Sequence, residues 1–285
     1  MNNNLMQQIM QSELTKSQMR IADYIVKNQK RMLGMTSKEV GKEIGVSDAT
    51  VIRFARAIGY EGYADLQEHV RKEIKESSEK IGKHSLFDRY VMQFQKYNEM
   101  DNSMGEVLQL MSMNLETSIR QNDSSIYKRV AEKILNADRK TVIGFRGGNG
   151  CALQFARLLG HITENVNAIV DEGYDQISKL MELDQDDVIV FLNFPRYYII
   201  DEKIENIIKE KNLHCFLITD SMTSPVAQCA EEILLVETEH CGFFHSMIGV
   251  EGVLEYLLIL MCWQRPEEFR KKLKIRDHVL EEYLI

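Results

Sequence analysis

The sequence predicts an all-α helix-turn-helix domain followed by an α/β doubly wound parallel five-stranded sheet. Apolar residues recur at helical spacing near the N-terminus, and two short helices there each end at a glycine. After residue 140, short apolar runs alternate with amphipathic helices, which is typical of a parallel sheet covered on both faces. We expect three regions: a helical domain over 1–76, a partly helical linker over 77–104 and an α/β domain over 105–285.

The first region is expected to contain a sequence of short capped helices. A threonine or serine precedes each of the first three, and its hydroxyl can accept a backbone N–H of the first turn. Glycine accepts the left-handed conformation that ends a helix. The expected elements are a helical segment from cap Thr15 to Met32, Ser37–Ile44 between Thr36 and Gly45, a helix from cap Ser47 to Ile58 before Gly59, and Tyr63 to about Ile74.

The third of these helices has one apolar and one polar side. Val51, Phe54, Ala55 and Ile58 form its inward stripe. The outward side has small, hydroxylated and basic residues, which can approach base edges and phosphates. The candidates for contact with DNA are Lys42, Ser47, Asp48, Ala49, Thr50, Arg53 and Arg56.

The charge distribution is compatible with this interpretation. The chain has 285 residues and a net charge of −8, but residues 1–80 hold 13 Lys and Arg against 11 Asp and Glu. Between Lys16 and Arg56 there are 9 basic and 4 acidic residues. Such asymmetry is a hint of nucleic-acid contact. The alternative is a helical bundle that serves only dimerisation.

The run from Thr36 to Leu66 resembles the N-terminal domain of the RpiR family of bacterial transcription regulators. That family has a Val-Ser-x-x-Thr-Val-x-Arg-Phe core followed by Gly-Phe/Tyr-x-Gly-Phe/Tyr. Here the core begins at Val46 and ends at Phe54, and the tail runs from Gly59 to Tyr63. The resemblance implies that Ser47, Thr50 and Arg53 face DNA. It further implies a partner DNA site, and two-fold symmetric operators predict a homodimer or homotetramer.

The linker contains Ser77-Ser78 and Gly82, and its residues Leu86, Tyr90, Phe94 and Tyr97 fit helical spacing. It suits either a segment that transmits ligand state or a passive tether. The α/β region should then contain five strands: Thr141–Phe145, Asn167–Val170, Val188–Leu192, Cys215–Ile218 and Ile233–Val236. The helices expected between and after them are Ala152–His161, Tyr174–Met181, Asp201–Lys211, Pro225–Cys229 and Ser246–Trp263.

Three strand ends have residues suited to an anion. Ligands in open parallel sheets bind at the carboxyl ends of the strands, and glycines at a helix N-terminus let the backbone approach a negative group. The first strand is followed by Arg146, Gly147, Gly148 and Asn149, and the third by Asn193, Arg196 and Tyr198. The fourth is followed by the hydroxyl-rich run from Thr219 to Pro225. Each loop could also be an ordinary turn without a ligand.

Residues 126 to 262 resemble the sugar isomerase (SIS) domain that follows the DNA-binding head in RpiR regulators. The matching pieces are Gly-Phe-Arg at 144–146, Phe-Pro-Arg-Tyr at 194–197, Ile-Thr-Asp-Ser at 218–221 and Phe-Phe-His-Ser at 243–246. The resemblance implies a phosphorylated sugar as ligand and adds His245 and Ser246 to the candidates. SIS domains usually have serines where this chain has Gly147 to Asn149, so backbone N–H groups and arginines are expected to replace them.

Three other classes of function, a dinucleotide-binding protein, a phosphosugar isomerase and a dimerisation scaffold, fit the sequence less well. A dinucleotide site with Asp171 as the ribose-binding acid lacks the required glycine spacing. A phosphosugar isomerase would need a base, for which His161, Glu172 and His245 are available. His240, Cys241 and His245 match no standard metal spacing. A dimerisation scaffold would leave the strand-end arginines unexplained. We expect a regulator without catalytic activity, metal or cofactor.

The sequence also indicates in which cellular compartment the protein is expected. The N-terminal ten residues contain no basic residue, unlike a secretory signal. The longest apolar run, Val253 to Trp263, is interrupted by Glu255 and is too short to span a membrane, so it should be a buried helix. Five scattered cysteines at 151, 215, 229, 241 and 262 indicate a reducing compartment. The protein is expected in the cytoplasm, without a membrane partner.

Overall fold

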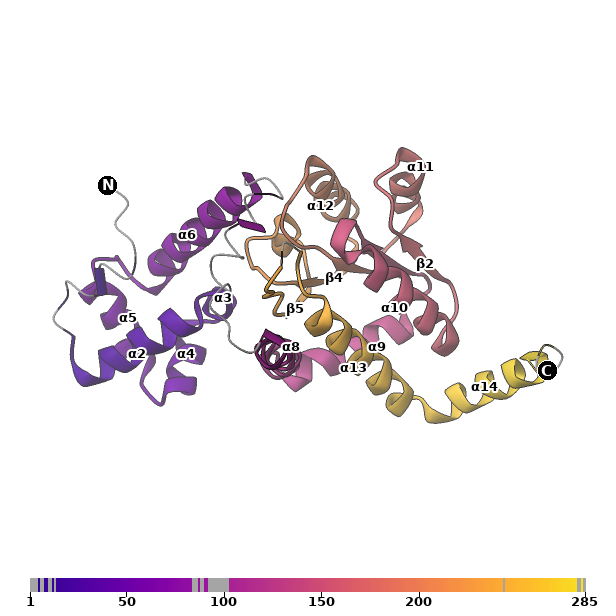
Figure 1. Cartoon of the computed structure of the whole chain (residues 1–285), viewed down its shortest axis with the longest axis horizontal. Helices are drawn as coiled ribbons and strands as arrows, with labels where there is room; N and C mark the ends of the chain where they lie inside the picture. Colours follow the sequence, from indigo (N-terminus) through magenta and orange to yellow (C-terminus); the bar gives the residue numbers. More distant parts are fainter. Residues whose placement is uncertain are drawn as a thin grey trace. The chain divides into compact units, whose positions relative to one another are not determined.

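The computed structural model describes residues 14–83, 103–242 and 244–280, together with Leu5, Gln8, Ile9, Ser12, Phe87, Tyr90, Val91 and Tyr283. The chain divides into two compact units, which we call the N-terminal unit (mainly residues 1–83) and the C-terminal unit (mainly residues 84–285). Figure 1 shows the helices and strands of both units. Most of the expected linker, including Leu86, Phe94 and Tyr97, lies outside the described residues.

The described helices of the N-terminal unit are α2 Lys16–Lys27, α3 Gln29–Met32, α4 Ser37–Ile44, α5 Asp48–Ala57 and α6 Tyr63–Lys83. The caps Thr15 and Thr36 are confirmed, since their hydroxyls accept the N–H of Gln18 and Glu39. The segment expected over Thr15 to Met32 breaks at Asn28, whose side-chain amide donates to Tyr24 O at 2.8 Å and competes with the helical ladder.

Two expectations about helix ends are wrong. Helix α6 continues to Lys83 instead of ending near Ile74. Ser47 precedes α5 as expected, but its hydroxyl makes no capping bond to the backbone and instead pairs with Thr50 Oγ1 at 2.8 Å. Gly45 and Gly59 have φ values of +73° and +99°, the left-handed conformation expected of them.

The core of the N-terminal unit forms where these helices meet. The predicted inward stripe of α5 is confirmed: Val51, Phe54 and Ala55 are fully buried and Ile58 is nearly so. Helix α6 is tied to the α3–α4 connection by Tyr63, whose hydroxyl donates to Met32 O, and by Gln67, which donates to Met32 O and Met35 O. The α4–α5 pair is therefore supported from behind by an independent helix.

The C-terminal unit contains a five-stranded parallel sheet of order β2-β1-β3-β4-β5. Its strands are β1 Lys140–Gly144, β2 Val166–Ile169, β3 Val188–Leu192, β4 His214–Thr219 and β5 Glu232–Leu235. The prediction of five parallel strands is confirmed, with β1, β2 and β5 displaced by one residue. Because β1 lies between β2 and β3, the sheet has its switch point at the β1–β3 boundary.

Helices cover both faces of this sheet. On one face lie α9 Ser124–Asn136, α10 Asn149–Ile162 and α13 Ile248–Gln264, with α8 Ser103–Arg120 packed against α13. On the other lie α11 Tyr174–Ile177, the 3-10 turns Ser178–Glu182 and Pro225–Gln228, and α12 Ile199–Lys211. The helices expected over Tyr174–Met181 and Pro225–Cys229 are thus mostly 3-10 turns. Figure 1 shows the resulting three layers.

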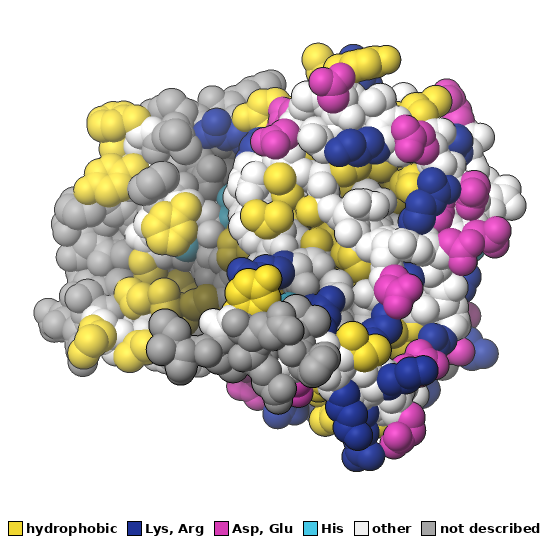
Figure 2. All heavy atoms as spheres, turned by 90° about the vertical axis from the view of Figure 1, so that its right-hand side faces the viewer, with side chains coloured by type: hydrophobic (Ala, Val, Ile, Leu, Met, Phe, Trp, Pro, Cys, Tyr) yellow, Lys and Arg dark blue, Asp and Glu magenta, His cyan; other side chains and the backbone are white. Residues whose placement is uncertain are grey.

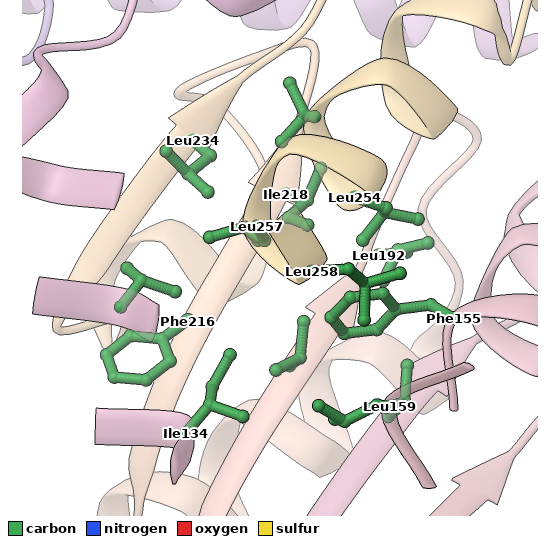
Figure 3. Packing of buried hydrophobic residues seen from close by; sticks show 14 of the residues in the cluster. Ile134, Phe155, Leu159, Leu192, Phe216, Ile218, Leu234, Leu254, Leu257 and Leu258 are labelled. Atoms are coloured by element: carbon green, nitrogen blue, oxygen red, sulfur yellow. The ribbon is translucent and has the colours of Figure 1, made fainter. Parts of the chain in front are cut away.

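Helix α13 is the buried helix that the apolar run predicts. Leu254, Leu257 and Leu258 project toward the sheet, where they meet side chains of β3, β4 and β5 (Figure 3). Phe155 of α10 closes the same cluster from the side. No helix among the described residues is long and apolar enough to cross a membrane.

Three helices were not predicted: α8, α9 and α14 Pro266–Leu280. Between α8 and α9, Asn122 accepts the N–H of Leu235 and donates to its carbonyl oxygen, both at 2.8 Å. Gln121 donates to the same oxygen. These side chains occupy hydrogen-bonding groups on the outer edge of β5, the last strand of the sheet that the described residues form.

Charged side chains of both signs alternate over the face of the molecule on the side of α14 (Figure 2). A few charged residues of the C-terminal unit are buried instead, and each calls for a partner. They are Lys140, Asp187, Asp201 and Asp220.

Candidate DNA-reading helix and strand-end site

Helix α5 presents a connected polar line on its outward side. The Ser47 hydroxyl contacts Thr50 Oγ1 at 2.8 Å, and Arg53 Nη2 donates to the same oxygen at 3.1 Å. The three residues are spaced by three, so they follow one side of the helix. The Arg53 side chain is solvent-exposed and makes no ion pair with any described residue. Its guanidinium therefore remains available to an external acceptor.

The other candidates of this surface also lie outside the core. Lys42, Asp48, Ala49 and Arg56 are exposed, and Thr50 is half-buried. Arg56 Nε donates to Glu61 O at 3.1 Å, which holds its side chain toward the loop before α6. The structure thus brings all seven predicted residues to the surface of the α4–α5 pair. Their contact with DNA stays a prediction.

The turn between α4 and α5 is closely packed. Gly41 lies so near the turn that an added Cβ would sit 2.8 Å from Val46 O. The N–H of Val46 donates to Gly41 O at 2.8 Å, and Gly45 provides the left-handed residue between them. Because Ser47 follows directly, this turn sets the start of the polar line on α5.

At the carboxyl edge of the sheet, six polar residues form what we call the strand-end network: Arg146, Glu172, Asn193, Tyr198, Asp201 and Ser224. Its centre is Asp201 in the first turn of α12, which is fully buried. Asp201 accepts hydrogen bonds from Arg146 Nη2 at 3.1 and 3.2 Å, from Asn193 Nδ2 at 2.9 Å and from the Tyr198 N–H at 2.6 Å. Loops after β1 and β3 are thereby joined at the switch point.

The environment of Asp201 acts on its pKa in two directions. Burial raises the pKa, whereas the Tyr198 N–H and the Arg146 guanidinium lower it, and the net result is a pKa above the usual value. Glu172, which also pairs with Arg146, adds a negative charge that contributes to the rise. Hydrogen-bond donors thus hold the Asp201 carboxyl group in place, while its burial and the nearby Glu172 disfavour its negative charge.

Arg146 makes contacts within the chain that the sequence did not predict. Its guanidinium is shared by the carboxylates of Asp201 and Glu172 and lies over the Tyr198 ring, 4.2 Å from the centroid. Its backbone is left-handed, with φ of 53°. With two carboxylates at hand, the positive charge is already compensated. Arg146 therefore positions the β1 loop, and its direct contact with an anion stays a prediction.

The network extends to the fourth strand through Asn193. Asn193 Oδ1 accepts the hydroxyl proton of Ser224 at 2.6 Å, and both residues are buried. Thr219, at the end of β4, is also buried. Loops after three adjacent strands, β1, β3 and β4, are consequently connected by side-chain hydrogen bonds.

The glycines of the β1 loop allow close approach of backbone to backbone. A Cβ on Gly144 would lie 2.7 Å from Gly148 O and 2.6 Å from Ala152 Cβ. Gly147 is exposed and has open space around it, and Asn149 donates to Val170 O at 3.0 Å as α10 begins. The positive end of the α10 dipole thus faces the carboxyl edge of the sheet.

The remaining candidates border the same edge from other loops. Arg196 is half-buried in the β3–α12 loop, and Tyr198 is exposed apart from its contact with Arg146. Ser246 is buried and its N–H donates to Thr238 O at 3.1 Å, whereas the His245 ring packs edge-on against His240 at 5.8 Å. Contact of these four residues with a ligand stays a prediction.

The three candidate bases are not brought together. Glu172 is bound to Arg146 at the carboxyl edge, whereas His161 lies near the C-terminal end of α10 at the amino edge of the sheet. His245 contacts another imidazole. Among the described residues, no group of three His, Cys, Asp or Glu side chains is arranged to hold a metal ion.

Sequence reasoning missed Asp201 as a site residue. A usable signal existed for it: with Ile204 and Ile208 it falls on the buried side of α12, so a carboxylate at that phase needs a partner. Ser224 lies in the hydroxyl-rich run expected after the fourth strand, but its partner Asn193, 31 residues away, was not predicted.

Comparisons with known proteins agree with both parts of the fold. Residues 1–77 match the family description "Helix-turn-helix domain, rpiR family", and residues 133–259 match "SIS domain". An uncharacterized HTH-type transcriptional regulator of Clostridium perfringens is 23% identical over 274 residues, covering 94% of this chain and 95% of the relative. Another from Providencia stuartii is 23% identical over 175 residues, and the match spans only 58% of that protein.

Two solved structures share the fold. The sugar isomerase domain of an RpiR transcription factor from Sphaerobacter thermophilus aligns with 61% of this chain and 97% of its own, at 22% identity and a TM-score of 0.58. The Vibrio vulnificus NanR protein complexed with ManNAc-6P aligns with 98% of this chain and 97% of its own, at 17% identity and a TM-score of 0.56.

Proposed function

Because the chain belongs to the rpiR family of helix-turn-helix transcriptional regulators, with a SIS domain after its DNA-binding head, we propose how its two sites divide the work. Helix α5 reads operator DNA, and a small phosphorylated sugar bound at the carboxyl edge of the sheet controls that binding. The observation that supports DNA reading is the exposed line Ser47–Thr50–Arg53 on a helix buried on its other side.

The chemistry of α5 suits the major groove. An arginine can donate two hydrogen bonds to guanine, and hydroxyls near the helix N-terminus can reach bases or phosphates. Thr50 holds Arg53 in the unbound protein through a single hydrogen bond to an uncharged hydroxyl, which can be exchanged for a base edge. Lys42 and Arg56 then contribute phosphate contacts that position the helix without reading sequence.

The proposed ligand site lies against the strand-end network. The backbone around Gly147 to Asn149 at the start of α10 faces the phosphate, since the helix dipole favours negative charge there. Arg146 with Asp201 and Asn193 holds the β1 and β3 loops in register, and Arg196, Tyr198, His245 and Ser246 border the sugar. The NanR structure contains a phosphorylated sugar, which supports this ligand class for a chain of the same fold.

A regulator accounts for the chain better than an isomerase. Its relatives are named transcriptional regulators, and its candidate bases lie at opposite edges of the sheet or in unrelated contacts. We propose that it catalyses no reaction, acts in the cytoplasm on DNA, and binds as a homodimer or homotetramer to a two-fold symmetric operator.

The DNA-reading part is tested by fluorescence anisotropy with labelled DNA from upstream of its own gene, or with selected genomic fragments. Arg53→Ala should weaken specific binding by about tenfold or more, as expected for a base-reading arginine. Lys72→Ala on α6 removes the same charge from another exposed position and serves as the control. Equal affinities of both variants and the unmodified chain would contradict base reading by α5.

The ligand part is tested by calorimetry with a panel of phosphosugars. Gly147→Asp places a carboxylate beside the proposed phosphate position and should abolish binding, whereas Gly147→Ala should retain it, because no heavy atom lies closer than 3.9 Å to the added Cβ. A sugar that binds should also shift the DNA-binding curve. Binding that is indifferent to Gly147→Asp would place the ligand elsewhere.

A further inference from the structure

A cavity of about 570 Å³ lies at the amino edge of the sheet, at the opposite end of the strands from the strand-end network. The C-terminal end of α10, the start of β2 and helix α14 surround it. Its polar lining includes Arg157, His161, Glu164, Asn165 and Arg276. We call it the amino-edge cavity, and its size falls in the range of small-molecule sites.

The arginines of this cavity are not neutralised by carboxylates. Arg276 of α14 donates to Gly160 O and contacts His161 Nδ1, two uncharged acceptors at the end of α10. Arg157 is exposed and makes no hydrogen bond or ion pair with the residues that the structure describes. Glu164 is the acid of the lining, and Lys272 binds it at 3.1 Å.

A lysine at the start of β1 adds a further positive charge at this edge of the sheet. Lys140 begins β1, is only 4% exposed, and its N–H donates to the carbonyl oxygen of Asn165, a residue of the lining. In the described part of the chain its ammonium has neither a hydrogen bond nor an ion pair. Burial lowers the pKa of Lys140 and repulsion from Lys272 adds to this, whereas Asp138 and Glu164 raise it. An ammonium in this position lacks a close counter-charge.

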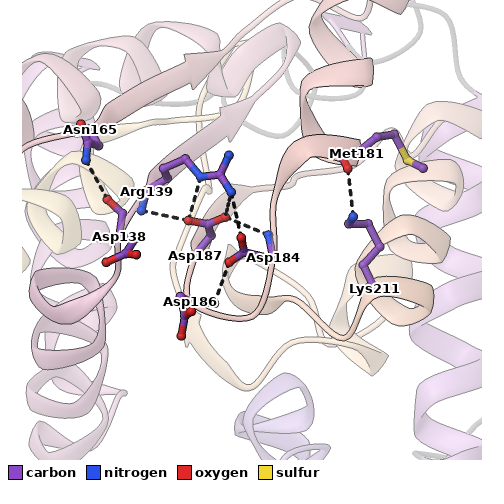
Figure 4. A network of polar contacts seen from close by, with 8 residues as sticks. All are labelled: Asp138, Arg139, Asn165, Met181, Asp184, Asp186, Asp187 and Lys211. Atoms are coloured by element: carbon purple, nitrogen blue, oxygen red, sulfur yellow. Dashed lines mark hydrogen bonds and ion pairs between the residues drawn. The ribbon is translucent and has the colours of Figure 1, made fainter.

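The neighbouring Arg139, at the same edge of the sheet, differs because carboxylates neutralise its charge. Its guanidinium is bound by Asp187 and Asp184 in the network of Figure 4. On the other side, Asn165 donates to the carbonyl oxygen of Asp138. The described residues therefore include acids bonded to Arg139 and none within bonding distance of Lys140, Arg157 or Arg276.

We propose that the amino-edge cavity is a second anion site, which takes a small multivalent oxyanion, that is, a ligand with two or more phosphate or carboxylate charges. Arg157 of α10 and Arg276 of α14 bind it from two helices, and Lys140 contributes from the strand below. A single charge would leave the set of cations uncompensated, so multivalent ligands are preferred. The site is independent of the phosphosugar site proposed above.

The test is isothermal calorimetry of the full chain with pyrophosphate and with citrate, against acetate at matched ionic strength. Pyrophosphate or citrate should bind at least about tenfold more tightly than acetate, and Arg157→Gln should weaken that binding by about tenfold or more, as the loss of one charge-assisted contact implies. Arg120→Gln removes an exposed arginine on α8 and should bind as the unmodified chain does.

Lys140→Met separates ligand binding from folding. Without oxyanion its melting temperature should stay close to that of the unmodified chain, because Lys140 makes no side-chain hydrogen bond or ion pair with the described residues that the substitution could remove, and the temperature rise caused by pyrophosphate should be lost. Gly147→Asp should leave pyrophosphate binding intact, which distinguishes this site from the strand-end site. Absence of binding at millimolar pyrophosphate, or binding lost in Gly147→Asp and kept in Arg157→Gln, would overturn the proposal.

Discussion

Replacing Gly41 by alanine should loosen the N-terminal unit, because the added Cβ has no room beside the turn that precedes α5. It would lie 2.8 Å from Val46 O and 3.4 Å from both the Asp48 nitrogen and the Ser47 carbonyl carbon. All three atoms belong to the backbone, so no side chain can rotate away. The turn itself must move, and the Val46 N–H to Gly41 O hydrogen bond lengthens with it.

The magnitude follows from three opposing contributions. Overpacking a well-packed contact costs about 1–3 kcal/mol, and a weakened backbone hydrogen bond adds about 1 kcal/mol. Alanine inside a helix returns about 1 kcal/mol through its higher helix propensity. The net loss is about 2 kcal/mol, which corresponds to roughly a 30-fold larger population of the opened state.

Hydrogen exchange of the full chain, followed by mass spectrometry, measures this loss locally. Peptides covering α5 should exchange roughly 30-fold faster in Gly41→Ala, and peptides covering α13 should be unchanged. Gly62→Ala is the control, since a Cβ there meets nothing within 4 Å. Identical α5 exchange in Gly41→Ala, Gly62→Ala and the unmodified chain would refute the steric reasoning.

Three further predictions concern stability. Burial by itself raises the pKa of Asp187, but hydrogen bonds from Arg139 and the Asp184 N–H outweigh it and leave the pKa below the usual value. The carboxylate therefore stabilises the fold above the ordinary Asp pKa of about 4, and this stabilisation is lost as pH falls through the lower folded value. Urea unfolding should show a weaker acid dependence for Asp187→Asn than for the unmodified chain; equal dependence would count against it. Leu257→Ala empties a fully buried position of α13 and should cost about 2–5 kcal/mol in the same assay, whereas a loss below about 1 kcal/mol would mean that the site collapses. Thr36→Ala removes the capping box of α4 and should cost about 0.5–2 kcal/mol, visible as faster exchange of α4 amides.

The variants at Asp187 and Leu257 each have a matched control in the chain. Asp186→Asn makes the same chemical change at an exposed acid of the same loop. Ile259→Ala shortens a side chain of α13 that is 44% exposed. Both controls should stay within about 1 kcal/mol of the unmodified chain.

The three inner strands β1, β3 and β4 could be predicted because each is a short, mainly apolar run that is covered on both faces. Val188–Leu192, for example, is buried at every position, and its limits coincide with the expected ones. Such runs contrast sharply with the polar loops around them. Helix α5 was predictable for the opposite reason, since its apolar and polar sides alternate at a period that only a helix satisfies.

Helices α8 and α9 were harder to identify from the sequence. Tyr127, Val130, Ala131 and Ile134 follow helical spacing in α9, so a signal was present there. Helix α8 is different, because it buries Asn114 and Ser118, polar residues whose partners Glu239 and Glu237 lie more than a hundred residues away. Sequence periodicity predicts that such polar positions are exposed, and they are buried only because of these long-range contacts.

The candidate site was predictable in its location and much less so in its contacts. Strand order places the loops after β1 and β3 beside each other, and the expectation of a site at that edge needs no side-chain detail. Identifying the partner of Arg146 does require side-chain detail. Most loops contain an acidic residue, and no local sequence feature distinguishes Asp201 from the others. Long-range pairing of charges is decided by geometry that the sequence does not display.

The amides of Gln121 and Asn122 have a consequence for how copies of this chain can associate. An outermost strand normally offers its backbone as a template on which another chain can extend the sheet. At Leu235 both the N–H and the C=O are already occupied by a side chain from the α8–α9 connection. A second copy cannot continue the sheet across this residue without displacing them. Extension of the sheet across β5 is thereby blocked at Leu235, which leaves the other edge strand β2, the helical surfaces and the loops for contacts between copies.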